Sequence, residues 1–233
     1  MSDEQRVFLI TGASTGIGAA TAHQAVAAGF RVALASRSKG KLDSLVRELG
    51  GADHALAIGC DVAEWESQRQ MVTDVLAIWG RIDVVFANAG LSKGSLYYGG
   101  DDTPDEWREM ILTNIYGAAA TARLTLPELV KNKGHFLITG SVAGRVTNTQ
   151  NLYAATKWAI TGMALSMRQQ LVGTGVRVTL IAPGKVETPF WATTPTDPML
   201  QADDVARAVL YAVSQPAHVD VNEILIRPVG QQI

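Results

Sequence analysis

The chain has 233 residues, 47% of them hydrophobic, and 20 basic and 22 acidic side chains give a net charge of −2. This length suits one large α/β domain over residues 1–233, and the absence of a basic block argues against a nucleic-acid partner. One cysteine and four scattered histidines exclude an internal disulfide and make a metal site unexpected. With neither a signal-like N-terminus nor an apolar run approaching about 18 residues, we expect a cytoplasmic protein without a membrane partner.

Short apolar runs alternate with longer helical patterns along the chain. Strands are predicted at 7–11, 31–35, 55–60, 82–87, 135–139, 176–181 and 223–226. Helices are predicted at 17–29, 39–49, 64–79, 104–131, 151–172 and 203–214. Most strand runs lack polar alternation, as expected for strands covered on both faces. The alternation predicts a three-layer, doubly wound α/β fold with right-handed crossovers and a parallel sheet.

One helix start is especially well marked. In Thr103-Pro-Asp-Glu106, a threonine precedes a proline and a glutamate follows three positions after the threonine. This spacing predicts Thr103 as the N-cap, proline in the first helical position and Glu106 as the second half of a capping box.

A glycine-rich segment, Thr11-Gly-Ala-Ser-Thr-Gly-Ile-Gly18, lies between the first predicted strand and the first helix. Gly12 permits a tight turn, Gly16 lets the backbone approach a pyrophosphate, and Gly18 allows close helix–strand packing. The helix start then presents free N–H groups to the phosphates. A plain structural turn is the alternative, but the position favours dinucleotide binding. The other loop residues predicted to contact the cofactor are Ser14, Thr15 and Ile17.

The end of the second predicted strand indicates which dinucleotide binds. An NAD-preferring site usually has Asp or Glu there for the ribose 2′-hydroxyl, whereas this chain has Ser36-Arg37-Ser38. The Arg37 guanidinium could pair with a 2′-phosphate, and Ser36 could donate a hydrogen bond to it. We therefore predict NADP(H) as the cofactor. The alternative is that Arg37 is only a solvated loop cation.

Tyr153-Ala-Ala-Thr-Lys157 places a phenol and an ammonium four residues apart on one face of a predicted helix. The pKa of a free phenol is about 10, and a nearby ammonium is expected to lower it. Ser141 lies at the end of an apolar run twelve residues upstream of Tyr153 and could hold a carbonyl oxygen against the same phenol. These groups predict proton transfer to or from an alcohol or carbonyl oxygen.

Together these motifs resemble the short-chain dehydrogenase/reductase family over nearly the whole chain. They stand in the family's order: the Thr11–Gly18 loop, Asp61, Asn88-Ala-Gly90, Asn114, Ser141, Tyr153-x-x-x-Lys157, and Pro183-Gly184 with Thr188. The resemblance implies a Rossmann-type fold with a seven-stranded sheet, usually assembled as a homotetramer or homodimer. One departure is Ala87, where the family commonly has Asn, so a structural hydrogen bond is expected to be missing.

The resemblance also implies roles for four residues in catalysis. Tyr153 would be the general acid for carbonyl reduction and the base for alcohol oxidation. Lys157 would lower the pKa of Tyr153 and bind the nicotinamide ribose, and Ser141 would orient the substrate oxygen. Asn114 would hold a water that links Lys157 to solvent, because a buried proton donor must be recharged in each turnover.

Further cofactor contacts follow from the same resemblance. Asp61 and Val62 would contact the adenine. Asn88, Ala89 and Gly90 would support the carboxyl end of the sheet and border the adenine ribose. Residues after the predicted strand 176–181 would hold the carboxamide end of the nicotinamide: Pro183, Gly184, Val186 and Thr188.

The expected function is that of an NADP(H)-dependent oxidoreductase acting on a small carbonyl or secondary alcohol. An alternative from another class is an NADP(H)-sensing protein that keeps the fold and has lost catalysis. Within the enzyme class, the segment 222–231 is similar to that of members that oxidise serine-like 3-hydroxy acids or reduce diverse carbonyls. Arg145 is a candidate for binding a substrate carboxylate, with a solvated arginine as its alternative.

Overall fold

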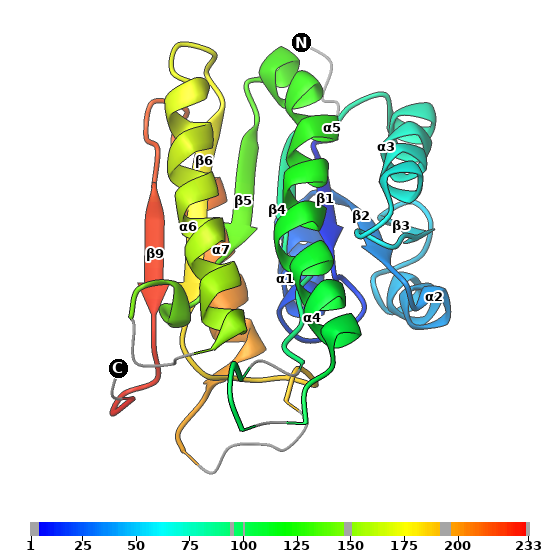
Figure 1. Ribbon diagram of the computed structural model, residues 1–233. Coiled ribbons are helices and arrows are strands. Elements are labelled where there is room, and N and C mark those ends of the chain that lie inside the picture. The colour runs from blue at the N-terminus through cyan, green and yellow to red at the C-terminus, as the bar shows by residue number, and fades with distance from the viewer. Residues whose placement is uncertain (1–4, 94–95, 100, 147–150, 192–196, 232–233) are drawn as a thin grey trace.

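Seven parallel strands form one sheet in the computed structural model, which describes residues 5–93, 96–99, 101–146, 151–191 and 197–231 (Figure 1). The strand order is β3-β2-β1-β4-β5-β6-β9. The strands are β1 Val7–Thr11, β2 Arg31–Ser36, β3 Ala55–Gly59, β4 Val84–Ala87, β5 His135–Thr139, β6 Arg177–Pro183 and β9 Glu223–Ile226. The order reverses between β1 and β4, which is where doubly wound sheets bind ligands.

Helices cover both faces of the sheet, as expected for parallel strands joined by crossovers (Figure 1). One face is packed by α3 Trp65–Trp79, α5 Gly117–Asn132 and α6 Leu152–Gln170. The other face is packed by α1 Gly16–Ala27, α2 Lys39–Glu48 and α7 Ala202–Ser214. The predicted three-layer fold is thereby confirmed. Among the described residues, none of the helices has the length and apolar character needed to cross a bilayer.

The strands send alternate side chains into two separate apolar layers. In β1, Val7 and Leu9 pack in the layer under α3, α5 and α6, whereas Phe8 and Ile10 pack in the layer under α1, α2 and α7. All four side chains are fully buried. This explains why the strand runs are continuously apolar, since each successive side chain meets a different layer of helices.

The predicted helix 104–131 is interrupted in the structure. It begins with α4, Pro104–Ile111, where the predicted Thr103–Glu106 capping box is confirmed. A π-helical turn, Leu112–Tyr116, follows, and α5 continues from Gly117. The prediction of one regular helix was therefore wrong, because a single inserted turn leaves the apolar pattern almost unchanged. A short parallel pair, β7 Val186–Glu187 with β8 Leu200–Gln201, was also not predicted.

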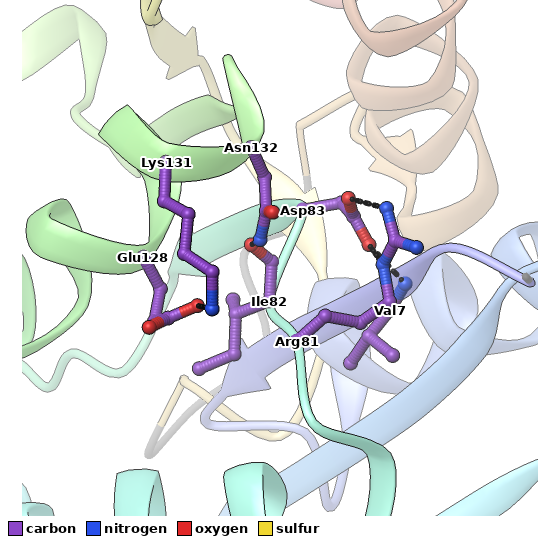
Figure 2. Close-up of polar contacts among 7 residues, drawn as sticks. All are labelled: Val7, Arg81, Ile82, Asp83, Glu128, Lys131 and Asn132. Carbon is purple, nitrogen blue, oxygen red and sulfur yellow. Dashed lines mark hydrogen bonds and ion pairs between the residues drawn. The ribbon is translucent and has the colours of Figure 1, made fainter.

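A buried carboxylate joins the amino ends of β1 and β4 (Figure 2). Asp83 Oδ2 accepts hydrogen bonds from the Val7 backbone N–H at 2.8 Å and from Arg81 Nε at 2.9 Å, and Asp83 Oδ1 accepts from Arg81 Nη2 at 2.8 Å. Nearby, Asn132 at the end of α5 donates to the Ile82 carbonyl oxygen at 2.9 Å. These bonds fix the positions of β1, β4 and α5 relative to one another. They lie at the amino end of the sheet, opposite the end where the site is predicted.

We expect Asp83→Asn to lower the free energy of unfolding by about 2 to 3 kcal/mol, because the buried oxygen atoms lose charge-assisted hydrogen bonds. Urea unfolding followed by tryptophan fluorescence would measure the change. Asp105→Asn, at a strongly exposed position on α4, is the control and should change stability little. Equal stability of the two variants would contradict a structural role for Asp83.

His135 is fully buried at the start of β5. Its Nε2 lies 2.7 Å from Thr179 Oγ1, and that hydroxyl donates its hydrogen to the Val221 carbonyl oxygen. The imidazole must therefore carry its hydrogen on Nε2, and Nδ1 has no hydrogen-bond partner among the residues that the structure describes. Burial, with Arg177 and Arg6 nearby, lowers the pKa of His135 to about 3.

This lowered pKa predicts a loss of stability in acid. The unfolded chain protonates His135 near pH 6.5, whereas the folded chain does so only near pH 3. Between these values the unfolded state binds the extra proton, so stability should fall as pH decreases, by up to about 1.4 kcal/mol per pH unit. Urea midpoints measured from pH 7 to pH 4 would test this. The urea midpoint should depend less steeply on pH in His135→Gln than in the wild-type protein. An identical dependence would contradict the lowered pKa of His135.

Candidate active site

A cavity of about 690 Å³ opens at the carboxyl ends of the central strands. In Figure 1 the arrowheads of β5 and β9 point toward this end of the sheet. The predicted residues that line the cavity are Gly12, Ser14, Thr15, Gly16, Ile17, Ser36, Arg37, Asp61, Val62, Asn88, Ala89, Gly90, Ser141, Tyr153, Lys157, Pro183, Gly184, Val186 and Thr188. Gly18 and Asn114 lie behind its wall. The fold thus gathers segments that are far apart in sequence at one end of the sheet.

Tyr153 and Ser141 meet inside the cavity. Tyr153 lies in the first turn of α6, which is capped by the Asn151 side chain accepting from the Ala154 N–H at 2.8 Å. Ser141 follows β5, and its hydroxyl oxygen accepts from the Ala143 N–H at 3.1 Å. Its side chain also interacts with the Tyr153 hydroxyl and lowers the pKa of that phenol. Tyr153 is half-buried, so its ring remains accessible from the cavity.

The pKa of Tyr153 moves in the direction opposite to the sequence expectation. Burial of the hydroxyl raises it to about 12, and the hydrogen bond with Ser141 offsets only part of that rise. Lys157 Nζ lies 5.7 Å from the centre of the Tyr153 ring. The expected lowering by Lys157 is therefore not found in the structure, because desolvation of the phenolate outweighs the other influences.

Lys157 is buried one turn further along α6. Its Nζ donates to the Thr139 carbonyl oxygen at the end of β5 over 2.9 Å. Burial lowers the pKa of Lys157 to about 8, so the amine is mostly charged at neutral pH. With this one acceptor among the residues that the structure describes, the buried ammonium keeps hydrogens available for a further oxygen atom in the cavity.

Asn114 lies in the π-helical turn and connects three segments. Its Oδ1 accepts from the Leu91 N–H at 2.9 Å, while its Nδ2 donates to the Leu91 carbonyl oxygen at 2.9 Å and to Thr156 Oγ1 at 3.1 Å. Both amide hydrogens are thus occupied, and π-helical turns are frequent at functional sites. Asn114 therefore fixes the loop after β4 against α6 beside Lys157.

The glycine-rich loop Thr11–Gly18 has the backbone that its glycines predict. Gly12 and Gly16 have φ angles of 64° and 55°, in the left-handed region that side chains disfavour. Asn88 holds the loop, since its Nδ2 lies 3.2 Å from the Thr11 carbonyl oxygen and 3.3 Å from that of Gly12. A Cβ atom on Gly18 would overlap the Gly12 carbonyl oxygen. Gly18 thus provides the close packing expected of it.

Arg37 forms an ion pair, which the sequence did not indicate. Its Nη1 lies 3.0 Å from Glu109 Oε1 on α4, and Glu109 Oε2 lies 2.8 Å from Lys93 Nζ. The neighbouring Ser36 hydroxyl oxygen accepts from the Ser38 N–H at 3.1 Å. The Arg37 side chain is therefore ion-paired but remains largely exposed at the cavity, and its role as more than a solvated loop cation stays a prediction.

Asp61 and Val62 border the cavity beside β3. Asp61 Oδ1 accepts from the Ala63 N–H at 2.9 Å, whereas α3 begins at Trp65 with Glu64 as its N-cap. Asp61 therefore shapes its own turn and does not cap the helix. Val62 is buried against Gly117, where a Cβ atom would lie 2.9 Å from Val62 Cγ2.

Several residues in the cavity wall were not predicted. Gln231, near the end of the chain, accepts a hydrogen bond on Oε1 from the Lys185 N–H at 2.9 Å. Phe190, for which the sequence allowed either pocket lining or local packing, also lines the cavity, and its ring lies 5.8 Å from the Tyr153 ring. Aromatic and amide side chains on distant loops give no periodic signal, so only the fold could bring them here. Residues 192–196 lie outside the described residues.

Arg145, the candidate for binding a substrate carboxylate, is bound elsewhere. Its Nη2 lies 2.7 Å from Glu223 Oε2, and its Nε donates to Glu223 Oε1 at 2.8 Å. This bidentate pair joins the segment after β5 to the edge strand β9. The guanidinium is thus already bound to a carboxylate of the chain itself.

Known proteins share this arrangement of strands, loops and helices. The model of the short chain dehydrogenase family matches residues 6–198. An uncharacterized oxidoreductase of Staphylococcus aureus is 38% identical over 228 residues, covering 96% of this chain and 97% of the relative. The match with the relative extends beyond that with the family model, over nearly the full length of both chains.

Two solved structures are also similar over nearly their full length. An alcohol dehydrogenase from the archaeon Thermococcus sibiricus, complexed with 5-hydroxy-NADP, has a TM-score of 0.88 at 31% identity, covering 99% of both chains. A closed form of serine dehydrogenase complexed with NADP+ has a TM-score of 0.89 at 31% identity, covering 97% of this chain and 96% of that one. From the motif order, the sheet topology and these matches, the chain belongs to the short-chain dehydrogenase/reductase family of oxidoreductases.

Proposed function

We propose that this protein is an NADP(H)-dependent oxidoreductase that interconverts a small carbonyl compound and a secondary alcohol, with Tyr153 as general acid and base. The observation that carries the proposal is the meeting of Tyr153, Ser141 and Lys157 in one cavity with the glycine loop. A phenol in contact with a hydroxyl and beside a buried amine is suited to proton transfer at an oxygen atom. A protein that only senses the dinucleotide has no need of this set.

The lining of the cavity supports a dinucleotide as its ligand. At one end, the start of α1 and the positive-φ glycines offer backbone N–H groups to a pyrophosphate. At the other end, Pro183, Gly184, Val186 and Thr188 line the cavity close to Tyr153 and Lys157. Two similar structures were solved with NADP or an NADP derivative. These observations support a nicotinamide end beside the phenol and a phosphate end at the glycine loop.

The choice of NADP(H) over NAD(H) is supported by the end of β2. Ser36 and Arg37 line the cavity there, and a carboxylate is missing from positions 36–38. A guanidinium can bind a 2′-phosphate through two parallel hydrogen bonds. A carboxylate in the same place would instead repel the phosphate and accept from a 2′-hydroxyl.

In the reduction direction, Tyr153 donates its proton to the substrate oxygen. The bound nicotinamide would supply the hydride. Because burial raises the pKa of Tyr153 to about 12, the phenol keeps its proton at neutral pH, which is the form needed to donate. Ser141 would hold the substrate oxygen in line with the phenol. Alcohol oxidation requires the reverse, so Tyr153 must then accept a proton.

Lys157 and Asn114 would support this proton transfer. The Lys157 amine, fixed by the Thr139 carbonyl oxygen, has hydrogens left for a ribose hydroxyl. Both side-chain amide hydrogens of Asn114 are used. A water between Lys157 and solvent would therefore have to donate a hydrogen bond to an oxygen atom of Asn114. This arrangement would let the phenol regain its proton after each turnover.

The substrate is proposed to be small, and serine-like 3-hydroxy acids are the narrower candidate. Lys185 lines the cavity beside Gly184, and Asp197 pairs with it. A substrate carboxylate could take the place of Asp197 on this amine. The similar serine dehydrogenase makes serine a suitable first substrate to test, alongside aldehydes and ketones. The family resemblance further supports a homodimer or homotetramer.

We expect Tyr153→Phe to lower kcat by a factor of about 10² to 10⁴, because the variant lacks the proton donor. NADPH binding should remain, because the change removes one oxygen atom and keeps the ring. Turnover would be followed by NADPH absorbance with the carbonyl panel, and binding by quenching of tryptophan fluorescence.

Tyr211→Phe, at an exposed position on α7, is the matched control and should keep full activity. A Tyr153→Phe variant with near-normal kcat would refute the proton-donor role. A wild-type protein that binds NADPH but turns over none of the panel would instead favour the sensing alternative.

We expect Gly18→Ala to weaken NADPH binding and to lower the free energy of unfolding by about 1 to 3 kcal/mol. The added Cβ would overlap the Gly12 carbonyl oxygen, so the phosphate loop must shift. Thermal unfolding and fluorescence titration would measure both effects. Gly40→Ala in α2, where a Cβ meets open space, is the control and should keep binding and stability. Unchanged NADPH affinity in Gly18→Ala would contradict the phosphate-loop assignment.

A further inference from the structure

Glu109 bridges two cations at the wall of the cavity. Its two carboxylate oxygens contact different partners, Arg37 Nη1 at 3.0 Å and Lys93 Nζ at 2.8 Å. Arg37 follows β2 and Lys93 follows β4, and both line the cavity. Glu109 itself stands behind them on α4. One carboxylate is therefore shared by two side chains from opposite sides of the point between β1 and β4 where strand order reverses.

The bridge is charged and sits where the phosphate of the proposed cofactor would bind. The hydrogen bonds from Lys93 and Arg37 hold the pKa of Glu109 below its usual value, so the carboxylate is ionised at neutral pH. The guanidinium that would receive a 2′-phosphate thus already has an anionic partner. A 2′-phosphate on Arg37 must either share the guanidinium with Glu109 or displace it.

We propose that Glu109 is a specificity-determining residue that limits the preference for NADP(H) over NAD(H) by opposing the 2′-phosphate at Arg37. This inference rests on the proposed function, because it concerns how Arg37 meets that cofactor. Sharing the guanidinium brings two negative groups close together, and displacing Glu109 breaks its hydrogen bond with Arg37. Both routes weaken the binding of NADP(H). The neutral 2′-hydroxyl of NAD(H) causes neither effect.

A purely structural role for the bridge is the competing explanation. Side-chain exposure is 59% for Arg37, 50% for Lys93 and 31% for Glu109. Ion pairs at such positions contribute little to stability. Removal of the Glu109 charge should therefore leave the fold intact, and any effect should be found in cofactor binding.

Glu109→Gln tests the proposal, with dissociation constants for NADPH and NADH measured by tryptophan fluorescence titration. We expect NADPH to bind about fivefold more tightly than to the wild-type protein, and NADH to bind equally well. Raising the salt concentration should reduce the gain for NADPH, because salt screens the repulsion. Asp105→Asn is the matched control, since it removes the same charge from α4 at a position 87% exposed and paired with Arg108.

The sign and the cofactor dependence of the result decide the outcome. Weaker or unchanged NADPH binding in Glu109→Gln would overturn the proposal, because it would mean that the carboxylate positions Arg37 or is irrelevant. An equal gain for NADH, or the same gain in Asp105→Asn, would also overturn it. If the wild-type protein does not bind NADPH, the cofactor assignment itself is refuted. If it does bind, a failure in Glu109→Gln refutes only the role of Glu109.

Discussion

Burial of the parallel sheet on both faces is the constraint on which the rest of this molecule depends. Because helices cover both faces, the central strands have little room for functional polar groups along their length. Such groups can reach solvent mainly where strands end. The carboxyl ends of β1, β4 and β5 meet at the point where strand order reverses. The glycine loop, Asn88 and Ser141 are brought together there as a direct result of how the sheet is covered.

The same burial determines the electrostatics of the site. Lys157 and the hydroxyl of the half-buried Tyr153 both lose contact with water, and their pKa values move in opposite directions, each toward the neutral form. Desolvation always favours the uncharged state, which for an amine means a lower pKa and for a phenol a higher one. The two pKa values thus move apart, to about 12 for Tyr153 and about 8 for Lys157. Transfer of a proton from the Tyr153 phenol to a neutral Lys157 amine is therefore more costly than between the free side chains, whose pKa values are nearly equal.

Most of the fold could be predicted from the sequence, because its signals are local. Apolar runs and helical patterns place the elements within two residues at their ends, except where the π-helical turn divides one predicted helix. That turn adds little to the apolar pattern, so periodicity cannot reveal it. The proposed role of Asn114 came from the family motif, whereas its bonds to Leu91 and Thr156 depend on tertiary packing.

The candidate site was less predictable where it depends on distant pairs. Motif spacing identified Tyr153, Lys157 and Ser141, and the structure places all three in one cavity. The partners of charged residues were missed, since Glu109 and Arg37 are far apart in sequence and no pattern joins them. The direction of the Tyr153 pKa was also missed. Sequence shows the neighbouring ammonium but not the loss of water around the phenol.

The hydrogen bond between Gln231 and Lys185 has a practical consequence for work on the purified protein. It links Gln231 to the loop that carries Gly184 and Val186 in the cavity wall. An affinity tag fused after residue 233 could break this hydrogen bond and so disturb the wall of the cavity. A tag placed ahead of Val7 would lie at the amino end of the sheet, opposite the cavity. It would not disturb the hydrogen bond between Gln231 and Lys185.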